Sequence, residues 1–365
     1  MKSISRNGRN DTIDAFRGIA ILGVLLFHYS VLWAPPWYGT NLYGYGRVYP
    51  DVLVLGAVGV YLFFVISGLV ITMTVLRSMS GLEFVVRRFA RLYPAFLVGI
   101  CLTLLVAGIS AIPAFKVSFG DVVANLTMNA TAFHRHYVDG AYWSLAIEIK
   151  FYALVAVAYV LLRDRFWMAI AGVAALGFVL FEFGITKQIL LAPYGPLFLA
   201  GMAVWFWLFE KRRLPALVLA CEALVLYVSY RHKFELARVS PWLSHLCLCL
   251  SVATLVTLLA LARNIRMGPL AAIGRMSYSL YLIHQNIGVI IIASLTAIGL
   301  SDIPAFLMAT GICFTAAALM FRFVEQPAQR VIMSAYRRVS LAPASFRTGF
   351  SRRGTEPRRA PDTAQ

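Results

Sequence analysis

Charged residues are scarce in this chain. Only 13% of its 365 residues are Asp, Glu, Lys or Arg, whereas a soluble domain of ordinary composition carries about 25%. Hydrophobic residues make up 60%, and the mean hydropathy is +0.76. Apolar segments in lipid must satisfy their backbone hydrogen bonds internally, so they fold as helices. The composition therefore argues against a soluble enzyme and predicts an all-α, polytopic transmembrane helical bundle.

Several common functional signatures are also missing. The five cysteines lie in apolar segments and match neither a disulfide framework nor a metal site, so we interpret them as buried hydrophobic residues. No Walker or dinucleotide-binding glycine loop is present, which argues against an ATP-driven pump. The net charge of +17 lies mostly in segments that flank apolar runs. It indicates membrane orientation rather than a nucleic-acid partner, and we expect no metal.

Ten apolar segments are long enough to cross a membrane, because about 20 helical residues span a ~30 Å hydrocarbon core. They are residues 14–34, 52–76, 92–112, 141–162, 166–184, 190–209, 214–230, 242–262, 270–293 and 303–323. With the N-terminus placed in the cytoplasm, 23 of the 33 Lys and Arg residues fall in inner segments and 7 in outer ones. This bias predicts a multi-pass protein of the inner (plasma) membrane with both termini cytoplasmic.

The domain organisation follows from the same pattern. We expect residues 1–12 to form a cytoplasmic N-terminus and residues 13–330 a single membrane domain. Residues 331–365 are basic, and their end is rich in Arg, Pro and Ser without periodicity. They predict a disordered cytoplasmic tail that contacts anionic membrane lipid.

The first span, residues 13–30 (IDAFRGIAILGVLLFHYS), carries three ionisable residues: Asp14, Arg17 and His28. Arg17 and His28 are eleven positions apart, so they lie on nearly the same helix face and about 16 Å apart along the axis. Ionisable groups in a bilayer are costly and usually face a bundle interior or a wet cavity. The pair therefore suggests a path from the cytoplasmic surface into the membrane.

Two more ionisable side chains are predicted at the depth of His28. Counting along each helix places His28, Glu148 and His284 all about 9–10 Å below the outer surface. A lone intramembrane histidine is about as often structural as functional. Three such groups on three spans in one layer favour a functional site.

The helix face around Glu148 supports this site. Ser144, Glu148 and Tyr152 recur at i, i+4 and i+8 and so line one face of their span. In the second span, Ser67 and Gly68 lie nearer the cytoplasmic side. Small residues there fit either a close helix contact or a slot for a narrow ligand arm.

A cationic segment at residues 77–91 (RSMSGLEFVVRRFAR) precedes the third span. We interpret it as a short inner loop, in which Arg87, Arg88 and Arg91 either contact lipid headgroups or clamp a phosphate. Arg275 falls about 7 Å inside the ninth predicted span, where snorkelling and ligand binding are equally good interpretations.

These positions describe a channel with arginines at its cytoplasmic mouth and an imidazole about 16 Å further in. A coenzyme with a phosphorylated head and a long thin arm fits this shape, and acyl-CoA is the obvious candidate. His28 would act as general base on an acceptor hydroxyl, with Glu148 orienting it. An acyl-histidine intermediate is a second possibility. The outer segments, residues 35–51 and 113–140, suit a sugar or polar lipid.

The same sequence is compatible with a different class of protein. In a proton-coupled transporter or exporter of a polar lipid or saccharide, His28, Glu148 and His284 would form a proton relay. Such transporters often contain repeats with broken helices at matching positions, and we find no such repeat.

The motifs of residues 11–330 resemble those of the acyltransferase family 3 membrane proteins, which include O-antigen and exopolysaccharide O-acetylases. Six stretches carry the resemblance in order: IDAFRGIA with His28, GVYLFFVISG at 59–68, RFARLYP at 88–94, WSLAIE at 143–148, SYSLYLIH at 277–284 and VEQP at 324–327.

The resemblance implies an enzyme that moves an acyl group, usually acetyl, from cytoplasmic acetyl-CoA to a hydroxyl of a glycan or lipid-linked saccharide at the outer face. It implies His28 as a catalytic residue and Arg17, Arg88 and Arg91 as donor-binding residues, with the membrane domain as the acyltransferase domain. We combine it with the pattern above into three groups. We expect catalysis by His28 and Glu148, donor binding by Arg17, Ser67, Arg88 and Arg91, and substrate binding by Asp14, Trp143, Ser144, Tyr281 and His284.

Overall fold

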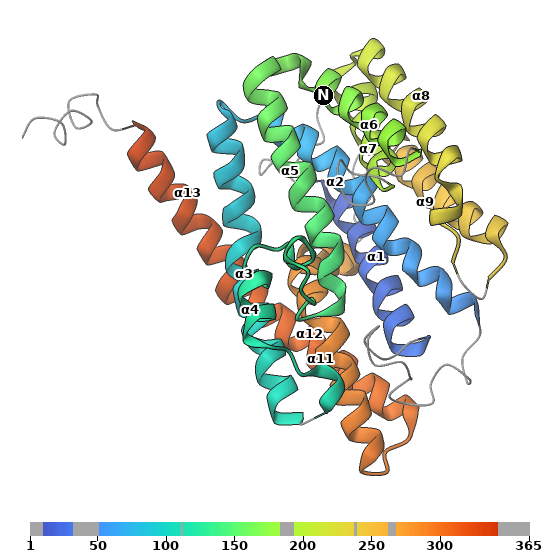
Figure 1. Cartoon of the computed structure of the whole chain (residues 1–365), viewed down its shortest axis with the longest axis vertical. Coiled ribbons are helices and arrows are strands. Elements are labelled where there is room, and N and C mark those ends of the chain that lie inside the picture. The colour runs from blue at the N-terminus through green and yellow to red at the C-terminus, as the bar shows by residue number, and fades with distance from the viewer. Residues whose placement is uncertain are drawn as a thin grey trace, which may run out of the picture.

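A computed structural model describes residues 10–31, 51–110, 112–182, 193–236, 239–261 and 268–341 (Figure 1). Within these ranges the chain is helical and contains no strand. The helices are α1 (Asp11–Ser30), α2 (Val58–Leu76), α3 (Gly81–Ser110), α4 (Phe119–Asn125), α5 (Trp143–Leu162), α6 (Phe166–Glu182), α7 (Gly195–Trp205), α8 (Arg213–Ser229), α9 (Pro241–Leu261), α10 (Gly268–Arg275), α11 (Ser277–Ala297), α12 (Asp302–Met320) and α13 (Gln326–Leu341).

The helical membrane architecture predicted from composition is confirmed. Seven helical stretches of the described chain are long and apolar enough to cross a membrane. Two of them, Gly140–Leu180 and Asp302–Ser340, each contain more than one helix. Each predicted span overlaps at least one helix of the described residues, while the count of ten and the orientation of the termini stay predictions.

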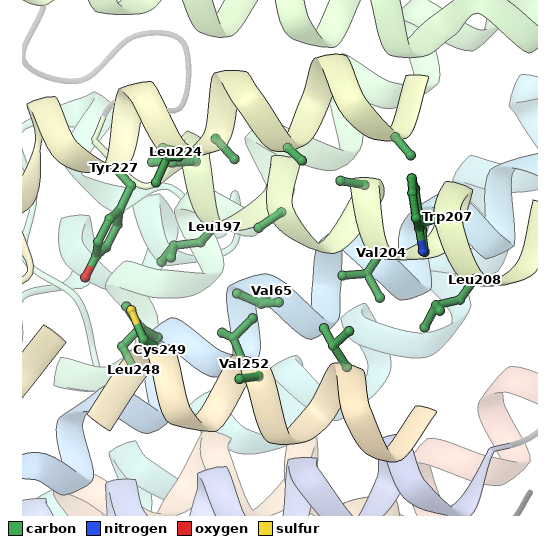
Figure 2. Close-up of a pocket in the computed structure, with 18 of the residues that line it drawn as sticks. Val65, Leu197, Val204, Trp207, Leu208, Leu224, Tyr227, Leu248, Cys249 and Val252 are labelled. Atoms are coloured by element: carbon green, nitrogen blue, oxygen red, sulfur yellow. The ribbon is translucent and has the colours of Figure 1, made fainter. Parts of the chain in front are cut away.

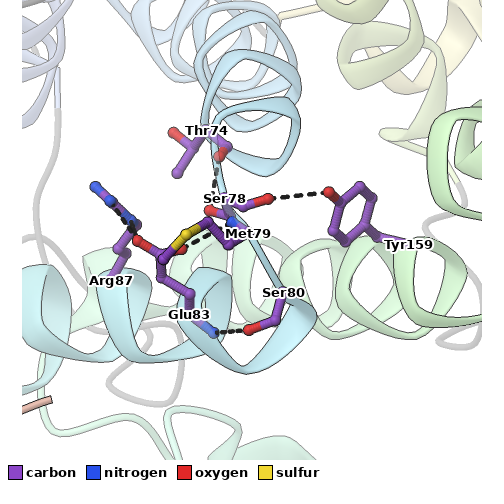
Figure 3. Close-up of polar contacts among 7 residues, drawn as sticks. All are labelled: Thr74, Ser78, Met79, Ser80, Glu83, Arg87 and Tyr159. Atoms are coloured by element: carbon purple, nitrogen blue, oxygen red, sulfur yellow. Dashed lines mark hydrogen bonds and ion pairs between the residues drawn. The ribbon is translucent and has the colours of Figure 1, made fainter. Parts of the chain in front are cut away.

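The cationic segment before the third span is helical rather than a loop. α3 begins at Gly81, and Pro94 lies inside it without ending it. Figure 3 shows why the helix starts there: the backbone N–H of Glu83 donates to Ser80 Oγ at 3.1 Å, as at a helix N-cap. The carboxylate of Glu83 accepts from Met79 N at 2.8 Å and pairs with Arg87 one turn later, at 2.5 Å.

The predicted span at residues 270–293 is divided. α10 ends at Arg275, Met276 separates the two helices, and α11 begins at Ser277. Arg275 therefore lies in the last turn of α10, where a cation is favourable, and not inside a long span. The break turns α11 into an independent helix that carries His284.

α10 packs so closely on α1 that glycines are required at the crossing. A Cβ on Gly274 would collide with the backbone oxygen of Asp14, and one on Gly18 would collide with that of Leu270. This contact of small residues holds the N-terminal half of α1, including Arg17, against α10.

The beginning of the predicted tail is also helical. Residues 331–341 belong to α13, which continues α12 through the π-turn Phe321–Glu325 and packs against α3. Composition predicted disorder for these residues, whereas the structure shows a helix that contacts α3. Residues 342–365 and 1–9 lie outside the described residues, as does the first predicted outer loop, 35–50.

The core is built around α1, α2 and α11. α1 packs against α2, α10 and α11, while α2 packs against α7 and α11 packs against α3 and α12. Figure 1 shows α1 and α2 inside the bundle with α5 in front of them. The ionisable residues of α1 and α11 therefore face protein rather than lipid.

Candidate active site

Two buried imidazoles meet between α1 and α11. His28 Nδ1 lies 3.0 Å from His284 Nε2, and the side chains are 9% and 0% exposed respectively. The hydroxyl of Tyr29, the next residue on α1, donates to the backbone oxygen of His284 at 2.8 Å. Consecutive residues of α1 thus hold both the side chain and the backbone of His284.

The hydrogen bonds of His284 define the tautomer of the neutral pair. His284 Nδ1 lies 2.8 Å from the backbone oxygen of Tyr281, and a carbonyl oxygen can only accept. Nδ1 of His284 therefore carries the hydrogen, and its Nε2 accepts from His28 Nδ1. This assignment leaves His28 Nε2 without a hydrogen, as a general base requires.

Glu148 lies apart from this pair. Its Oε1 accepts a hydrogen bond from Ser67 Oγ at 2.5 Å, and the same hydroxyl lies 3.2 Å from the phenol oxygen of Tyr152. The partner that orients His28 is thus His284, and not Glu148 as expected from their shared depth. Glu148 instead links α5 to Ser67 of α2.

A narrow cavity of about 60 Å³ lies near the histidine pair, although neither imidazole lines it. It is lined by residues of α1, α2, α5 and α11, namely Arg17, Val60, Phe63, Phe64, Ser144, Leu145, Glu148, Ser277, Tyr278 and Tyr281. Tyr281 connects it to the pair: its phenol oxygen lies 2.6 Å from Ser144 Oγ, and its ring packs on that of His284 with centroids 5.4 Å apart. We call this space the inner cavity.

A second cavity of about 110 Å³ adjoins Arg17 from the other side. Its lining includes three arginines from three helices, Arg17, Arg91 and Arg275, together with Asp14. We call it the arginine cavity. Because Arg17 lines both cavities, its side chain stands at their junction. Three guanidinium groups around one space favour an anionic ligand such as a phosphate.

Buried polar atoms without partners mark both cavities. Asp14 Oδ2 lies in the wall of the arginine cavity and Ser277 Oγ in that of the inner cavity, and neither has a hydrogen-bond partner. Native structures rarely leave such atoms unsatisfied. Their position fits cavities that receive a polar ligand.

The remaining predicted residues lie at the edge of this site. Arg88 is buried, donates to Thr74 Oγ1, and stacks 5.7 Å above the ring of Tyr152; it lines neither cavity. The ring of Trp143 packs against Phe64 and Tyr194 and supports the wall of the inner cavity rather than lining it. Arg87 is paired with Glu83.

The sequence interpretation missed one buried carboxyl group, that of Asp139, which contacts α11 two residues after His284. Asp139, 0% exposed, accepts from the backbone N–H groups of Ala141 at 2.9 Å and Asn286 at 3.0 Å. Asn286 Nδ2 in turn donates to the backbone oxygen of Val138 at 2.9 Å. Burial raises the pKa of Asp139 to about 7, although the two hydrogen bonds oppose the shift. The sequence offered one signal for this role, since an aspartate directly before a helical turn often caps it, as Asp139 caps the turn Gly140–Tyr142.

No group of three or more His, Cys, Asp or Glu side chains with a geometry suited to a metal occurs in the part of the chain that the structure describes. The groups available for chemistry are therefore the imidazole pair, the hydroxyls of Ser144 and Tyr281, and the arginines.

Comparison with known proteins gives one family and several relatives. The O-acetyltransferase OatA of Staphylococcus aureus is 25% identical over 87% of this chain, and the chain spans 57% of its length. The acyltransferase MdmB of Streptomyces mycarofaciens is 28% identical, over 66% of this chain and 70% of its own. The peptidoglycan O-acetyltransferase OatA of Listeria monocytogenes is 29% identical over 42% of this chain and 25% of its own.

No solved structure gives a significant match. A model of the acyltransferase domain of family 3 matches residues 10–322. That range contains the histidine pair and all residues of the two cavities. The chain therefore belongs to the family 3 membrane acyltransferases.

Proposed function

We propose that this protein transfers an acyl group, acetyl in the simplest case, from acyl-CoA to a hydroxyl of a saccharide or lipid-linked saccharide. The observation that carries the proposal is the hydrogen-bonded pair of His28 and His284, which leaves His28 Nε2 able to accept a proton. The pair contacts the wall of the inner cavity through the ring of Tyr281. Membership of an acyltransferase family supports the reaction class. The names of the relatives, an O-acetyltransferase and a peptidoglycan O-acetyltransferase, support an acetyl donor and a glycan acceptor.

The donor would enter through the arginine cavity. Arg91 and Arg275 offer guanidinium groups to the phosphates of coenzyme A, and Arg17 lies where the arm would pass into the inner cavity. The inner cavity is too small for the whole coenzyme. It would admit only the end of the arm, with the thioester directed toward the histidine pair.

The proposed reaction needs one base. His28 Nε2 accepts the proton of the acceptor hydroxyl while the hydroxyl oxygen attacks the thioester carbon. When the C–S bond breaks, the sulfur leaves as a thiolate and takes that proton from His28, which returns to its neutral form. His284 holds the tautomer of His28 and accepts its Nδ1 hydrogen bond throughout, as the third group of a catalytic triad does.

The inner cavity would hold the acceptor hydroxyl. Ser144 and Tyr281 lie in its wall with their oxygens 2.6 Å apart, and hydroxyls of this kind suit the recognition of a sugar or the stabilisation of a developing oxyanion. Glu148 also lines the inner cavity and is held there by the hydrogen bond from Ser67. A proton relay through His28, Glu148 and His284, which the transporter hypothesis requires, lacks the contact between Glu148 and either imidazole.

The proposal is tested with purified protein in lipid nanodiscs, acetyl-CoA, and peptidoglycan fragments or simple glycosides as acceptors. Mass spectrometry follows acetylated saccharide. We expect His28→Ala to lower the rate by about 10²–10⁴-fold, the usual contribution of a general base, while His232→Ala, at an exposed loop histidine, leaves it unchanged. Full activity of the His28→Ala protein would refute the catalytic role of the pair.

A further inference from the structure

A large apolar cleft lies between α8 and α9, away from the candidate active site. Its volume is about 500 Å³, and α7 and α2 form its floor (Figure 2). Side chains such as Val65, Leu197, Leu224 and Val252 point into it. We call it the α8–α9 cleft.

The cleft exists because its two rims pack on other helices rather than on each other. α8 packs against α6 and α7, α9 packs against α2 and α1, and α8 and α9 make few contacts with one another. Small side chains widen the cleft, since six alanines line it, among them Ala200, Ala216, Ala220 and Ala253. Water is a poor occupant because an apolar wall offers it no hydrogen-bond partners.

Cations lie at one end of the cleft. Trp207 and Leu208 line that end, and the guanidinium of Arg213 lies 3.8 Å from the centre of the Trp207 ring. Lys211 and Arg212 occupy the same turn, and Glu210 is its only acidic residue. A tryptophan beside arginine and lysine at a helix end is typical of the level of lipid headgroups.

The length of the cleft matches one leaflet of a bilayer. Its lining on α8 runs from Ala216 to Tyr227, which is about 16 Å along the helix, or about half of a ~30 Å hydrocarbon core. Tyr227 closes the far end, and its hydroxyl is 2.7 Å from His245 Nδ1. The cleft thus has a cationic mouth near the start of α8 and ends at Tyr227, two residues before α8 ends at Ser229.

We propose that the α8–α9 cleft binds one acyl chain of an anionic phospholipid, with its phosphate on Arg213 and the adjoining Lys211 and Arg212. The lipid comes from the leaflet on the side of the Lys211–Arg213 turn, which the charge bias predicts to be cytoplasmic. The inference does not depend on acyl transfer. It does bear on the site, because Val65 of α2 faces the cleft while Phe63 and Phe64 of the same helix face the inner cavity.

The headgroup part is tested by native mass spectrometry of protein taken from nanodiscs of phosphatidylglycerol and phosphatidylcholine in equal amounts. The wild type is expected to retain phosphatidylglycerol preferentially. Arg213→Gln is expected to lower that preference about fivefold, since one cation near the surface contributes about a factor of this size. Arg163→Gln is the matched control, because Arg163 also stacks on an aromatic ring, but that ring belongs to Tyr159, which does not line the cleft, whereas Trp207 does.

The acyl-chain part is tested by fluorescence quenching with phosphatidylglycerol brominated along its chain. The signal of Trp207, taken as the difference between the wild type and Trp207→Phe, is expected to be quenched more strongly than in phosphatidylcholine brominated in the same way. Ala220→Phe with Ala253→Phe fills the cleft and should abolish the difference. Val225→Phe, on the lipid-facing side of α8 where the side chain is 60% exposed, should preserve it.

Each result decides the proposal. Equal retention of both lipids by the wild type, or equal effects of Arg213→Gln and Arg163→Gln, would overturn the headgroup assignment. Unchanged quenching in the filled variant would overturn the acyl-chain assignment. Loss of acyl transfer with intact lipid retention would concern the proposed function alone, so the two failures are distinguishable.

Discussion

The backbone oxygen of Tyr281 lies 2.8 Å from Nδ1 of His284, while the phenol of Tyr281 reaches Ser144 in the wall of the inner cavity. One residue therefore serves two purposes: its backbone selects the tautomer of the histidine pair, and its side chain lines the cavity. The two functions can be separated by mutation, because only the side chain is altered by a substitution.

Replacing His284 is expected to lower kcat by about 10²–10⁴-fold, since His28 then loses the partner that holds its tautomer. The donor KM should be nearly unchanged, because His284 lines neither cavity. Steady-state kinetics of His284→Ala with varied acetyl-CoA measure both parameters. Tyr281→Phe keeps the backbone oxygen and should cost less than His284→Ala; the reverse order would contradict the assigned tautomer.

Arg17 and Arg91 are expected to control donor affinity. A hydrogen bond to a charged group contributes about 1.5–3 kcal/mol, so Arg17→Gln or Arg91→Gln should weaken acetyl-CoA binding by about 10–100-fold in isothermal titration calorimetry. Arg87→Gln is the control from the same cationic region, because Arg87 is already paired with Glu83. Equal losses for Arg87 and Arg91 would indicate a diffuse charge effect rather than a site.

The crossing of α1 and α10 is expected to tolerate no side chain at Gly274. A methyl group there would collide with the backbone of Asp14, so Gly274→Ala should lower the thermal unfolding temperature and weaken donor binding through Arg17. Gly172→Ala in α6 is the comparison, since no neighbour lies within 4 Å of its added Cβ. It should be neutral or stabilising by about 0.5–1 kcal/mol.

Two aspartates outside the spans are expected to give stability opposite dependences on pH. Burial raises the pKa of Asp139 to about 7, so between about pH 4 and 7 the folded form binds more protons than the unfolded form. Its contribution to stability therefore falls as the pH rises through that window, by at most about 4 kcal/mol. Burial also acts to raise the pKa of Asp121, but hydrogen bonds from Ser118 and the His136 N–H outweigh it and lower that pKa. Its contribution falls as the pH drops below about 4.

Thermal unfolding across pH 3–8 measures both effects. Asp139→Asn should flatten the decline between about pH 4 and 7, and Asp121→Asn should remove the loss at the acidic end. Identical pH profiles for wild type and Asp139→Asn would show that the carboxyl is not retained in its protonated form.

Much of the membrane fold could be predicted from the sequence, because long apolar runs admit few alternatives to helices. The helix ends were harder. The arginines of residues 77–91 indicated a loop before the third span, whereas the contacts of Ser80 and Glu83 start α3 earlier, at Gly81. Pro94 lies inside α3 without ending it. Nothing at Met276 signals the break between α10 and α11, which depends on the packing of α10 against α1.

The sequence predicted the level of the site residues in the membrane, but not which of them face one another. Counting residues places His28, Glu148 and His284 in one layer, and the structure brings the two histidines into contact. The position of Glu148 around the bundle axis depends on how α5 is rotated, and that rotation follows from contacts with α2 that no single-helix pattern contains. The division of the space at Arg17 into two cavities likewise depends on several helices together, namely α1, α2, α5 and α11 around the inner cavity and α1, α2, α3, α7 and α10 around the arginine cavity.

The adjacent positions of His28 and Tyr29 have a mechanical consequence. His28 is hydrogen-bonded to the imidazole of His284, and Tyr29 is hydrogen-bonded to its carbonyl oxygen. α1 therefore cannot rotate or slide along α11 without breaking both hydrogen bonds at once. The position of His28 Nε2, the proposed proton acceptor, is therefore fixed relative to the whole helical bundle. Only a separation of α1 and α11 would break the contact between His28 and His284. The orientation of the proposed base would then depend on helix movement rather than on fluctuation of its side chain.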